Sequence, residues 1–170
     1  MAASFLHSFQ ALVAWLRDNV TAPEQFTLSY AGEHSQFIRF NHARVRQAGD
    51  VKQSSASLKL IADGRQAELN LTLSGDEAID RQRLAEAVAQ LRQTLPLIPA
   101  DPYLLLNDSA WESHHQQEAP LPDSAQVLER IAAGAGDLDL VGIYAAGPIC
   151  RGFASSFGAV GWHQANSFNF

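Results

Sequence analysis

The side chains best suited to binding chemistry lie in one alternating run, residues 38–47. Its candidate binding residues are Arg39, Asn41, Arg44 and Gln47. Arg can hold a carboxylate or a carbonyl group, and Asn and Gln can pair with backbone amides. An extended strand that carries them would suit an extended peptide. The same pattern is also typical of the solvated face of a half-buried sheet, and on the pattern alone we favour that interpretation.

The parity of this run divides its side chains between two faces. In one regular strand Asn41 and Gln47 would share the face of Arg39, because side chains alternate along a strand. Phe40 has the opposite parity, so we expect it in the core. The run therefore predicts one polar face and one buried face.

Candidates for catalysis and metal binding are weak elsewhere. His114 and His115 are the best metal candidates, but adjacent residues of an extended chain point apart and seldom share an ion without further ligands. Cys150 has no His or Asn at an activating motif spacing, so we predict a buried thiol. We therefore expect no catalytic residue, metal or cofactor in this chain.

Three carboxylates near the start of one predicted helix have a structural explanation. Asp76, Glu77 and Asp80 would lie in its first turn, where acidic side chains complement the helix dipole. We therefore do not interpret them as an acid/base pair.

The composition describes a globular, acidic chain. The 170 residues are 46% apolar and 18% charged, with a formal net charge of −6. This length predicts a single domain over residues 1–170. Basic side chains are too dispersed for nucleic-acid binding, and no apolar run approaches the ~20 residues of a membrane helix. The single cysteine favours a reducing compartment, so we expect a cytoplasmic protein.

Apolar residues at helical spacing predict about three helices. The first has the stripe Phe5, Phe9, Leu12 and Leu16. The second has Leu84, Val88, Leu91 and Leu95, and Ser74 and Glu77 form a capping-box pair before it. The third begins near Asp123, turns Val127, Leu128 and Ile131 inward, and ends at Gly134 and Gly136.

Alternating runs predict a mainly antiparallel sheet. Four strands, at about 26–30, 36–47, 51–62 and 67–73, would form a meander, with Ala31-Gly32 after the first and Asp63-Gly64 as a type I′ turn. After a long proline-rich loop at 96–122, further strands flank a turn at Gly147-Pro148. The predicted fold class is α+β, a four-strand meander plus C-terminal strands with the helices packed on it.

The last residues, Ser167 to Phe170, alternate without a closing turn. An apolar edge of this kind invites association. We therefore expect further protein after this run. We also expect residues 160–170 to be poorly protected or to pair with another copy.

Several segments together resemble one protein family. They are Arg39-Phe40 followed by Val45 and Gln47, Leu60 to Arg65, Leu73-Ser74, Pro99 to Pro102, and Ala154 to Gly158. In this order they resemble the N-terminal domain of the TldD/PmbA family, also called modulators of DNA gyrase. The chain departs from the family pattern in two places. Asn41-His42 follow Arg39-Phe40 where many members have a small residue and then Asn, and Ser155 stands where Asn is usual.

The resemblance implies a role in proteolysis. Active TldD/PmbA-like proteins are dimeric zinc metallopeptidases that act on unstructured peptides. The zinc ligands lie in a C-terminal domain, which this chain lacks, and the N-terminal domain lines the peptide channel and helps to form the dimer. The resemblance thus implies that Arg39, Asn41, Arg44 and Gln47 contact peptide. The alternative is a non-enzymatic binding or assembly module, such as a metal-free partner subunit.

Overall fold

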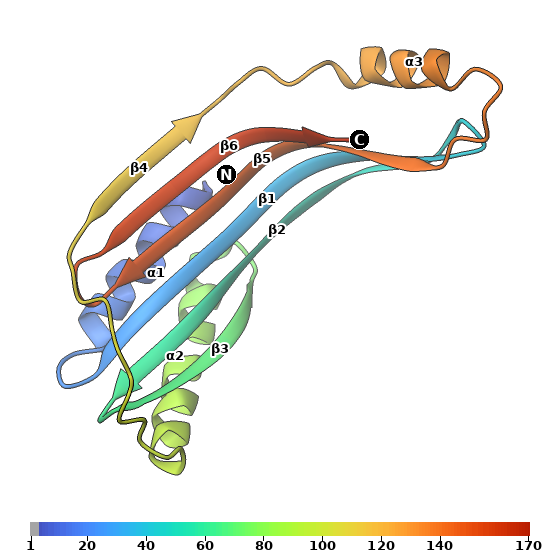
Figure 1. Ribbon diagram of the computed structural model, residues 1–170. Coiled ribbons are helices and arrows are strands. Elements are labelled where there is room, and N and C mark those ends of the chain that lie inside the picture. The colour runs from blue at the N-terminus through green and yellow to red at the C-terminus, as the bar shows by residue number, and fades with distance from the viewer. Residues whose placement is uncertain (1–3) are drawn as a thin grey trace. The chain divides into compact units, whose positions relative to one another are not determined.

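The structure, a computed structural model, describes residues 4–170 and contains one six-stranded sheet with the strand order β3-β2-β1-β5-β6-β4 (Figure 1). The elements are α1 (Phe5–Asn19), β1 (Gln25–Asn41), β2 (Arg44–Ala62), β3 (Arg65–Leu73), α2 (Glu77–Thr94), a 3-10 turn (Leu95–Leu97), β4 (Glu112–Gln117), α3 (Ser124–Ala135), β5 (Gly142–Ser155) and β6 (Val160–Asn169). The α+β class and the mainly antiparallel sheet are confirmed.

These elements divide between two compact units, and both units share the long strands. Unit 1 contains residues 4–32, 53–115 and 150–163, and unit 2 contains residues 33–52, 116–149 and 164–170. None of the helices in the described chain is long and apolar enough to cross a membrane.

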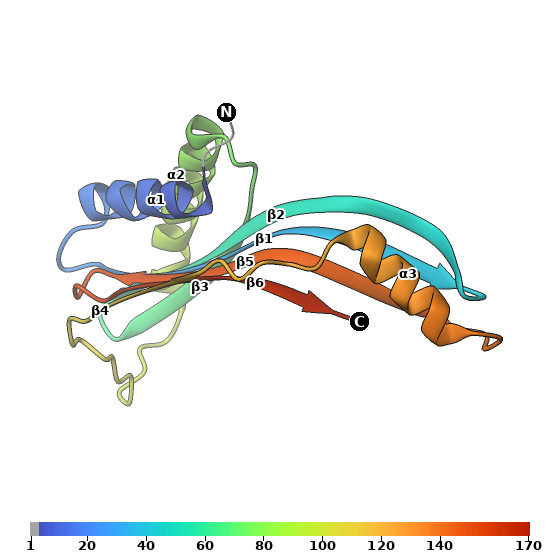
Figure 2. The same ribbon diagram turned by 90° about the horizontal axis from the view of Figure 1, so that it is seen from above.

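Helices α1 and α2 lie on the same face of the strands in unit 1 (Figure 2). Three of the four residues predicted as the α1 stripe, and all four predicted for α2, are buried: Phe9, Leu12, Leu16, Leu84, Val88, Leu91 and Leu95. They pack against strand residues such as Phe26, Leu28 and Leu58, which alternate toward the helices. Unit 1 is thus two amphipathic helices on one apolar sheet face.

The N-terminal strands form a three-strand meander, so the predicted four strands are wrong. The predicted turn at Ala31-Gly32 lies inside β1, and the true turn is His42-Ala43, where both residues have positive φ (50° and 52°). Gly32 is required by packing, since a Cβ there would meet Cys150 Sγ at 2.8 Å. The predicted Asp63-Gly64 turn is confirmed with φ values of 51° and 68°, and it pairs Ala62 with Arg65.

The predicted turn at Gly147-Pro148 is also wrong, because β5 runs through it. The backbone of Gly147 approaches β1 so closely that a Cβ would collide with the carbonyl oxygen of His34. Glycine at this position therefore serves close strand packing.

The sequence analysis did not predict strand β4, which lies within the predicted loop at 96–122. It pairs with β6 in the one parallel pair of the sheet: the amide of Val160 donates to the carbonyl of Trp111 (2.8 Å), and His115 lies beside His163 further along both strands. Strand β6 therefore lies between β5 and β4 in the sheet, and the expected low protection of residues 160–170, or their pairing with another copy, stays a prediction.

The start of α2 differs from the predicted capping box. Its N-cap is Asp76, whose carboxylate accepts from the amides of Ala78 (2.9 Å) and Ile79 (3.1 Å). Asp80 is buried, and its carboxylate accepts from the Ser74 amide (2.7 Å), the Ser74 hydroxyl (2.9 Å) and the Gly75 amide (3.0 Å). Asp80 therefore anchors the β3–α2 turn in addition to any dipole effect.

Unit 2 has one helix, α3, whose N-cap is Asp123 as predicted, with its carboxylate accepting from the amide of Ala125 (2.9 Å). Gly136 follows the helix with a φ of 51°. The predicted inward residues Val127, Leu128 and Ile131 pack on Phe40 and Tyr144, but they remain only partly buried. The apolar face of α3 is thus incompletely covered.

Candidate functional site

The predicted binding residues lie on the β1–β2 hairpin of unit 2. With a two-residue turn at His42-Ala43, Asn41 lies opposite Arg44. Opposed residues of an antiparallel pair share a face. Arg39, Asn41, Arg44 and Arg46 therefore lie on one face of the hairpin. Gln47 lies further along β2 and is exposed, and its place beside Arg39 stays a prediction.

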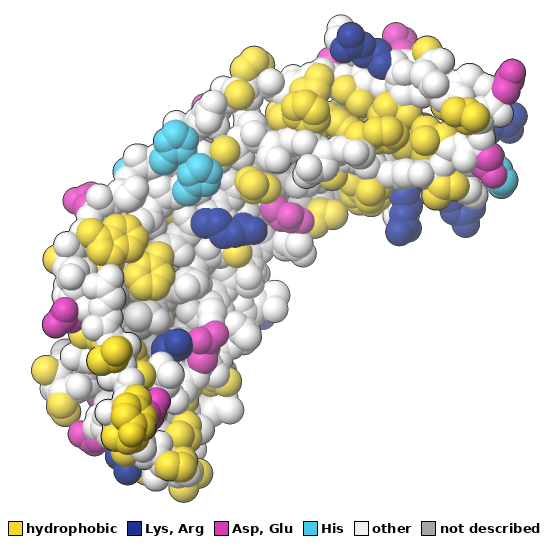
Figure 3. All heavy atoms as spheres, viewed as in Figure 1, with side chains coloured by type: hydrophobic (Ala, Val, Ile, Leu, Met, Phe, Trp, Pro, Cys, Tyr) yellow, Lys and Arg dark blue, Asp and Glu magenta, His cyan; other side chains and the backbone are white. Residues whose placement is uncertain are grey.

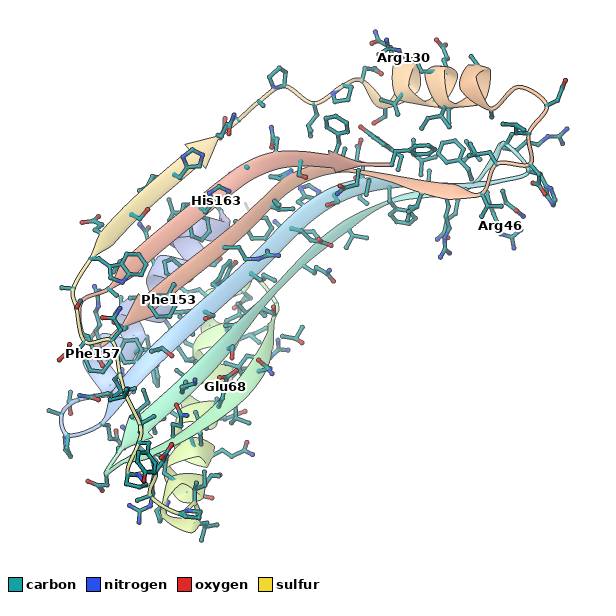
Figure 4. The ribbon with its side chains drawn as sticks, in the orientation of Figure 1. Arg46, Glu68, Arg130, Phe153, Phe157 and His163 are labelled. Atoms are coloured by element: carbon teal, nitrogen blue, oxygen red, sulfur yellow. The ribbon has the colours of Figure 1, made fainter. Side chains whose placement is uncertain are left out.

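This face of the hairpin displays its arginines to solvent. Arg39, Arg44 and Arg46 are exposed, and Asn41 is half-buried. None of the three guanidinium groups forms an ion pair with any residue between 4 and 170. Arg46 projects on the side of the hairpin away from α3 (Figure 4). Each arginine is thus free to hold a carbonyl or a carboxylate group of another molecule.

The hairpin turn is held to the segment that follows α3. His42 Nδ1 lies 2.8 Å from Asp139 Oδ1, and the amide of Ala43 donates to the carbonyl of Leu140 (3.1 Å). Both contacts fix the tip without using an arginine. Phe40, on the other face, is 3% exposed, which confirms that it lies in the core.

An apolar groove of about 900 Å³ lies between α3 and the strands of unit 2, and it is visible as a yellow patch in Figure 3. Its walls are Pro120, Leu121, Pro122, Val127, Arg130, Ile131, Gly134, Ala135, Leu138, Leu140, Tyr144, Phe168 and Phe170. Phe168 and Phe170 are 59% and 65% exposed although Phe170 meets Phe40 edge-on at 6.0 Å. Sequence reasoning missed this groove, and only the unclosed Phe168-Phe170 alternation pointed to it.

The wall of this groove contains a polar atom with no partner. The side chain of Tyr144 is 2% exposed, and its hydroxyl makes no hydrogen bond within the described chain. A buried hydroxyl without a partner costs free energy. Trp162 Nε1, in the core of unit 1, is buried without a partner among the described residues in the same way, so this feature does not distinguish the groove from that core.

The two histidines proposed as metal candidates do not converge. They lie on β4, and His115 stacks on His163 of β6 with ring centroids 4.9 Å apart. His114 is its neighbour on the strand and therefore belongs to the opposite face. Across residues 4–170, no three His, Cys, Asp or Glu side chains are grouped so that they could hold a metal ion.

Cys150 is a core residue of unit 1. Its side chain is fully buried, and its thiol donates to the carbonyl of Gly32 at 3.5 Å. Burial raises the pKa of the Cys150 thiol to about 11, despite the opposing charge of Arg151. A thiol in this state is a poor nucleophile, in agreement with the sequence prediction.

Two segments that carried the family resemblance have structural roles. Arg65 Nε donates to the carbonyl of Ile98 (2.8 Å), and the amide of Asp101 donates to the carbonyl of Gly64 (2.8 Å), so this hairpin fixes the loop after α2. Ser155 Oγ accepts from the amide of Ala159 (3.2 Å) inside the β5–β6 turn.

No family model and no curated protein matches the sequence. Solved structures do match in three dimensions. TldE from Thermococcus kodakarensis covers 95% of this chain with a TM-score of 0.67 and 14% identity. This chain has a TldE-like fold. Proteins described as DNA gyrase modulators match too, from Thermotoga maritima (TM-score 0.60, 11% identity, 97% of this chain) and Bacteroides thetaiotaomicron (0.60, 14%, 96%).

The resemblance to the TldD/PmbA family is thus confirmed in the fold. The chain spans 37% of the length of the TldE chain, and 38% and 39% of the two DNA gyrase modulators. It therefore corresponds to part of each of these proteins.

Proposed function

We propose that this chain is a peptide-channel and dimerisation domain of a TldD/PmbA-like zinc metallopeptidase, and that it is inactive alone. In the whole protein, zinc held outside these residues would supply the hydrolytic chemistry. The observation that carries the proposal is a row of exposed arginines on the β1–β2 hairpin of a TldE-like fold, none of which has an ionic partner in the part of the chain that the structure describes.

The proposed contribution of the hairpin is to hold and orient the peptide backbone. Arg39 and Arg46 offer planar donor groups on one face, and Asn41 and Arg44 lie next to them toward the turn. We assign the peptide contacts to Arg39, Asn41, Arg44 and Gln47, the last of which is an exposed residue of β2. Because three cations line this face, it should prefer peptides with carboxylate groups.

Peptide binding to the 170-residue chain tests this proposal. A fluorescein-labelled, unstructured acidic peptide should bind, as measured by anisotropy, and should remain uncleaved. Arg39→Ala should weaken binding by about tenfold, the expected cost of one charge-assisted contact. Arg17, an exposed arginine on α1 of unit 1, offers the matched control, and Arg17→Ala should leave binding unchanged.

Three results would count against the proposal. If the parent chain and the Arg39→Ala variant bind the acidic peptide equally, the hairpin does not bind it through Arg39. Cleavage of the peptide by the isolated chain would contradict its inactivity alone. A chain that bound a TldE-like subunit but no peptide would support the alternative, a metal-free assembly module.

A further inference from the structure

Strand β6 has an open edge where it reaches the apolar groove. On its outer side β6 pairs, among the described strands, with β4 alone, which ends at Gln117. The chain continues through Pro120 and Pro122, which have no amide hydrogen to donate to a strand partner. Within residues 4–170, Ser167 to Asn169 therefore have a strand on the side of β5 only. Next to them the side-chain amide of Asn166 donates to the carbonyl of Ala119 (2.8 Å), so the segment after β4 stays near this edge without forming a strand on it.

The groove beside this edge suits uncharged, apolar side chains. Arg130 is its one charged wall residue, and Figure 4 shows that the Arg130 side chain is directed away from the strands. A charged group placed in the groove would lose hydration without gaining an ionic partner, which is costly. Its volume of about 900 Å³ is within the range of pockets that hold a ligand of several side chains.

We propose that the groove and the open edge of β6 together bind an extended, uncharged peptide segment that adds as a strand beside Ser167–Asn169. Backbone hydrogen bonds to the edge supply the binding, and every second side chain enters the groove between Ile131 and Phe168. The inference that the ligand of this site is a peptide rests on the proposed function. It differs from the arginine face in position and in the chemistry that it selects.

Two peptides of about ten residues and identical composition test the site. In one, Leu and Phe alternate with Ser and Thr, and in the other the alternation is scrambled. The alternating peptide should bind the 170-residue chain, as measured by anisotropy, and the scrambled peptide should bind about tenfold more weakly because its apolar residues cannot share one face.

A matched pair of variants separates the groove from general surface effects. Phe168 lines the groove and is 59% exposed, so Phe168→Ser should weaken binding of the alternating peptide by about tenfold with little effect on folding. Ile143 is 50% exposed but does not line the groove, so Ile143→Ser should bind as the parent does. Thermal melting of both variants checks that they fold.

Unchanged binding in Phe168→Ser, or an equal loss in Ile143→Ser, would overturn the groove site. A dimer in which the β6 edges of two copies pair with each other and exclude the peptide would also overturn it. If the acidic peptide binds through Arg39 while the alternating peptide does not, the groove inference fails and the proposed function stands. If only the alternating peptide binds, and Arg39→Ala has no effect on it, the hairpin assignment fails instead.

Discussion

Units 1 and 2 use the same long strands but cover them to different degrees. In unit 1, α1 and α2 contribute stripes of buried residues, and within this core Phe9, Tyr30 and Trp162 are in mutual ring contact. In unit 2 the buried core is Phe40, Tyr144 and Ala146, and the helix α3 only partly covers it. The sheet face of unit 1 is thus covered by its two helices, although the loop after α2 exposes apolar side chains such as Leu97 and Leu105. Unit 2 keeps an open apolar groove and three arginines that have no ionic partner among residues 4–170.

Truncating one phenylalanine in each unit gives the largest expected effect. Phe26 is fully buried in unit 1, so Phe26→Ala should lower the free energy of unfolding by roughly 3–5 kcal/mol. Phe40→Ala should cost about 3 kcal/mol, at the lower end of the same range, because the neighbouring groove leaves side chains free to relax. Urea unfolding followed by circular dichroism measures both. A larger loss for Phe40→Ala would show that unit 2 is packed as tightly as unit 1.

Thiol reactivity compares the two units chemically. With its pKa raised to about 11, Cys150 at pH 8 has about a hundredth of the thiolate fraction of an ordinary cysteine of pKa 9. A thiol reagent should therefore modify it at least that much more slowly until the chain unfolds. In the Ala133→Cys variant, the new thiol on the exposed side of α3 should react in a separate fast phase. A single fast phase for both thiols would show that unit 1 opens readily.

The raised pKa of Cys150 also fixes the direction of a pH effect. The folded chain holds the thiol proton more tightly than the unfolded chain, so stability from this group is complete below the unfolded pKa of 9 and is lost as pH rises through about 11. Tyr30, whose pKa burial raises to about 12, acts in the same direction at higher pH. Both groups belong to unit 1.

The helices could be predicted from sequence because each depends on local signals. The stripes of α1 and α2 are spaced at the helical period, and Asp123 precedes α3 as a cap should. The turns were harder, because Gly32 and Gly147 look like turn residues but serve close contacts with distant parts of the chain. Conversely, His42 and Ala43 adopt positive φ without any glycine to signal a turn.

The candidate site was predictable only in part for the same reason. The exposed arginines follow from the alternation near Arg39, but the turn at His42-Ala43, which brings Arg44 opposite Asn41, was not predicted. The groove depends on how far α3 covers the strands, which no local pattern around Val127 or Ile131 specifies. The open edge of β6 depends on β4, a strand formed entirely by exposed residues with no apolar alternation.

Helix starts in the two units should differ in their sensitivity to losing one carboxylate. Asp80→Ala leaves the Ser74 and Gly75 amides of unit 1 without their acceptor, so the free energy of unfolding should fall by about 2–3 kcal/mol. Asp123→Ala removes one exposed cap from α3, with an expected loss of about 1 kcal/mol. Equal losses on urea unfolding would show that the β3–α2 turn does not depend on Asp80.

Arginine substitutions give the smallest effect on stability and the sharpest separation of stability from function. Arg92 in unit 1 holds Glu24 in a bidentate pair (2.7–3.1 Å) and also donates to the carbonyl of Asn19, and Glu24 raises the pKa of its guanidinium. Arg92→Ala should cost about 1 kcal/mol, since both side chains of the pair are partly exposed. Arg39→Ala should cost about 0–0.5 kcal/mol, because this side chain is exposed and has no ionic partner within residues 4–170. Peptide binding should show the reverse order, with a clear loss for Arg39→Ala and none for Arg92→Ala. If Arg39→Ala instead lowers the melting temperature as much as Phe40→Ala and leaves peptide binding intact, Arg39 is a structural residue and unit 2 loses its proposed polar site.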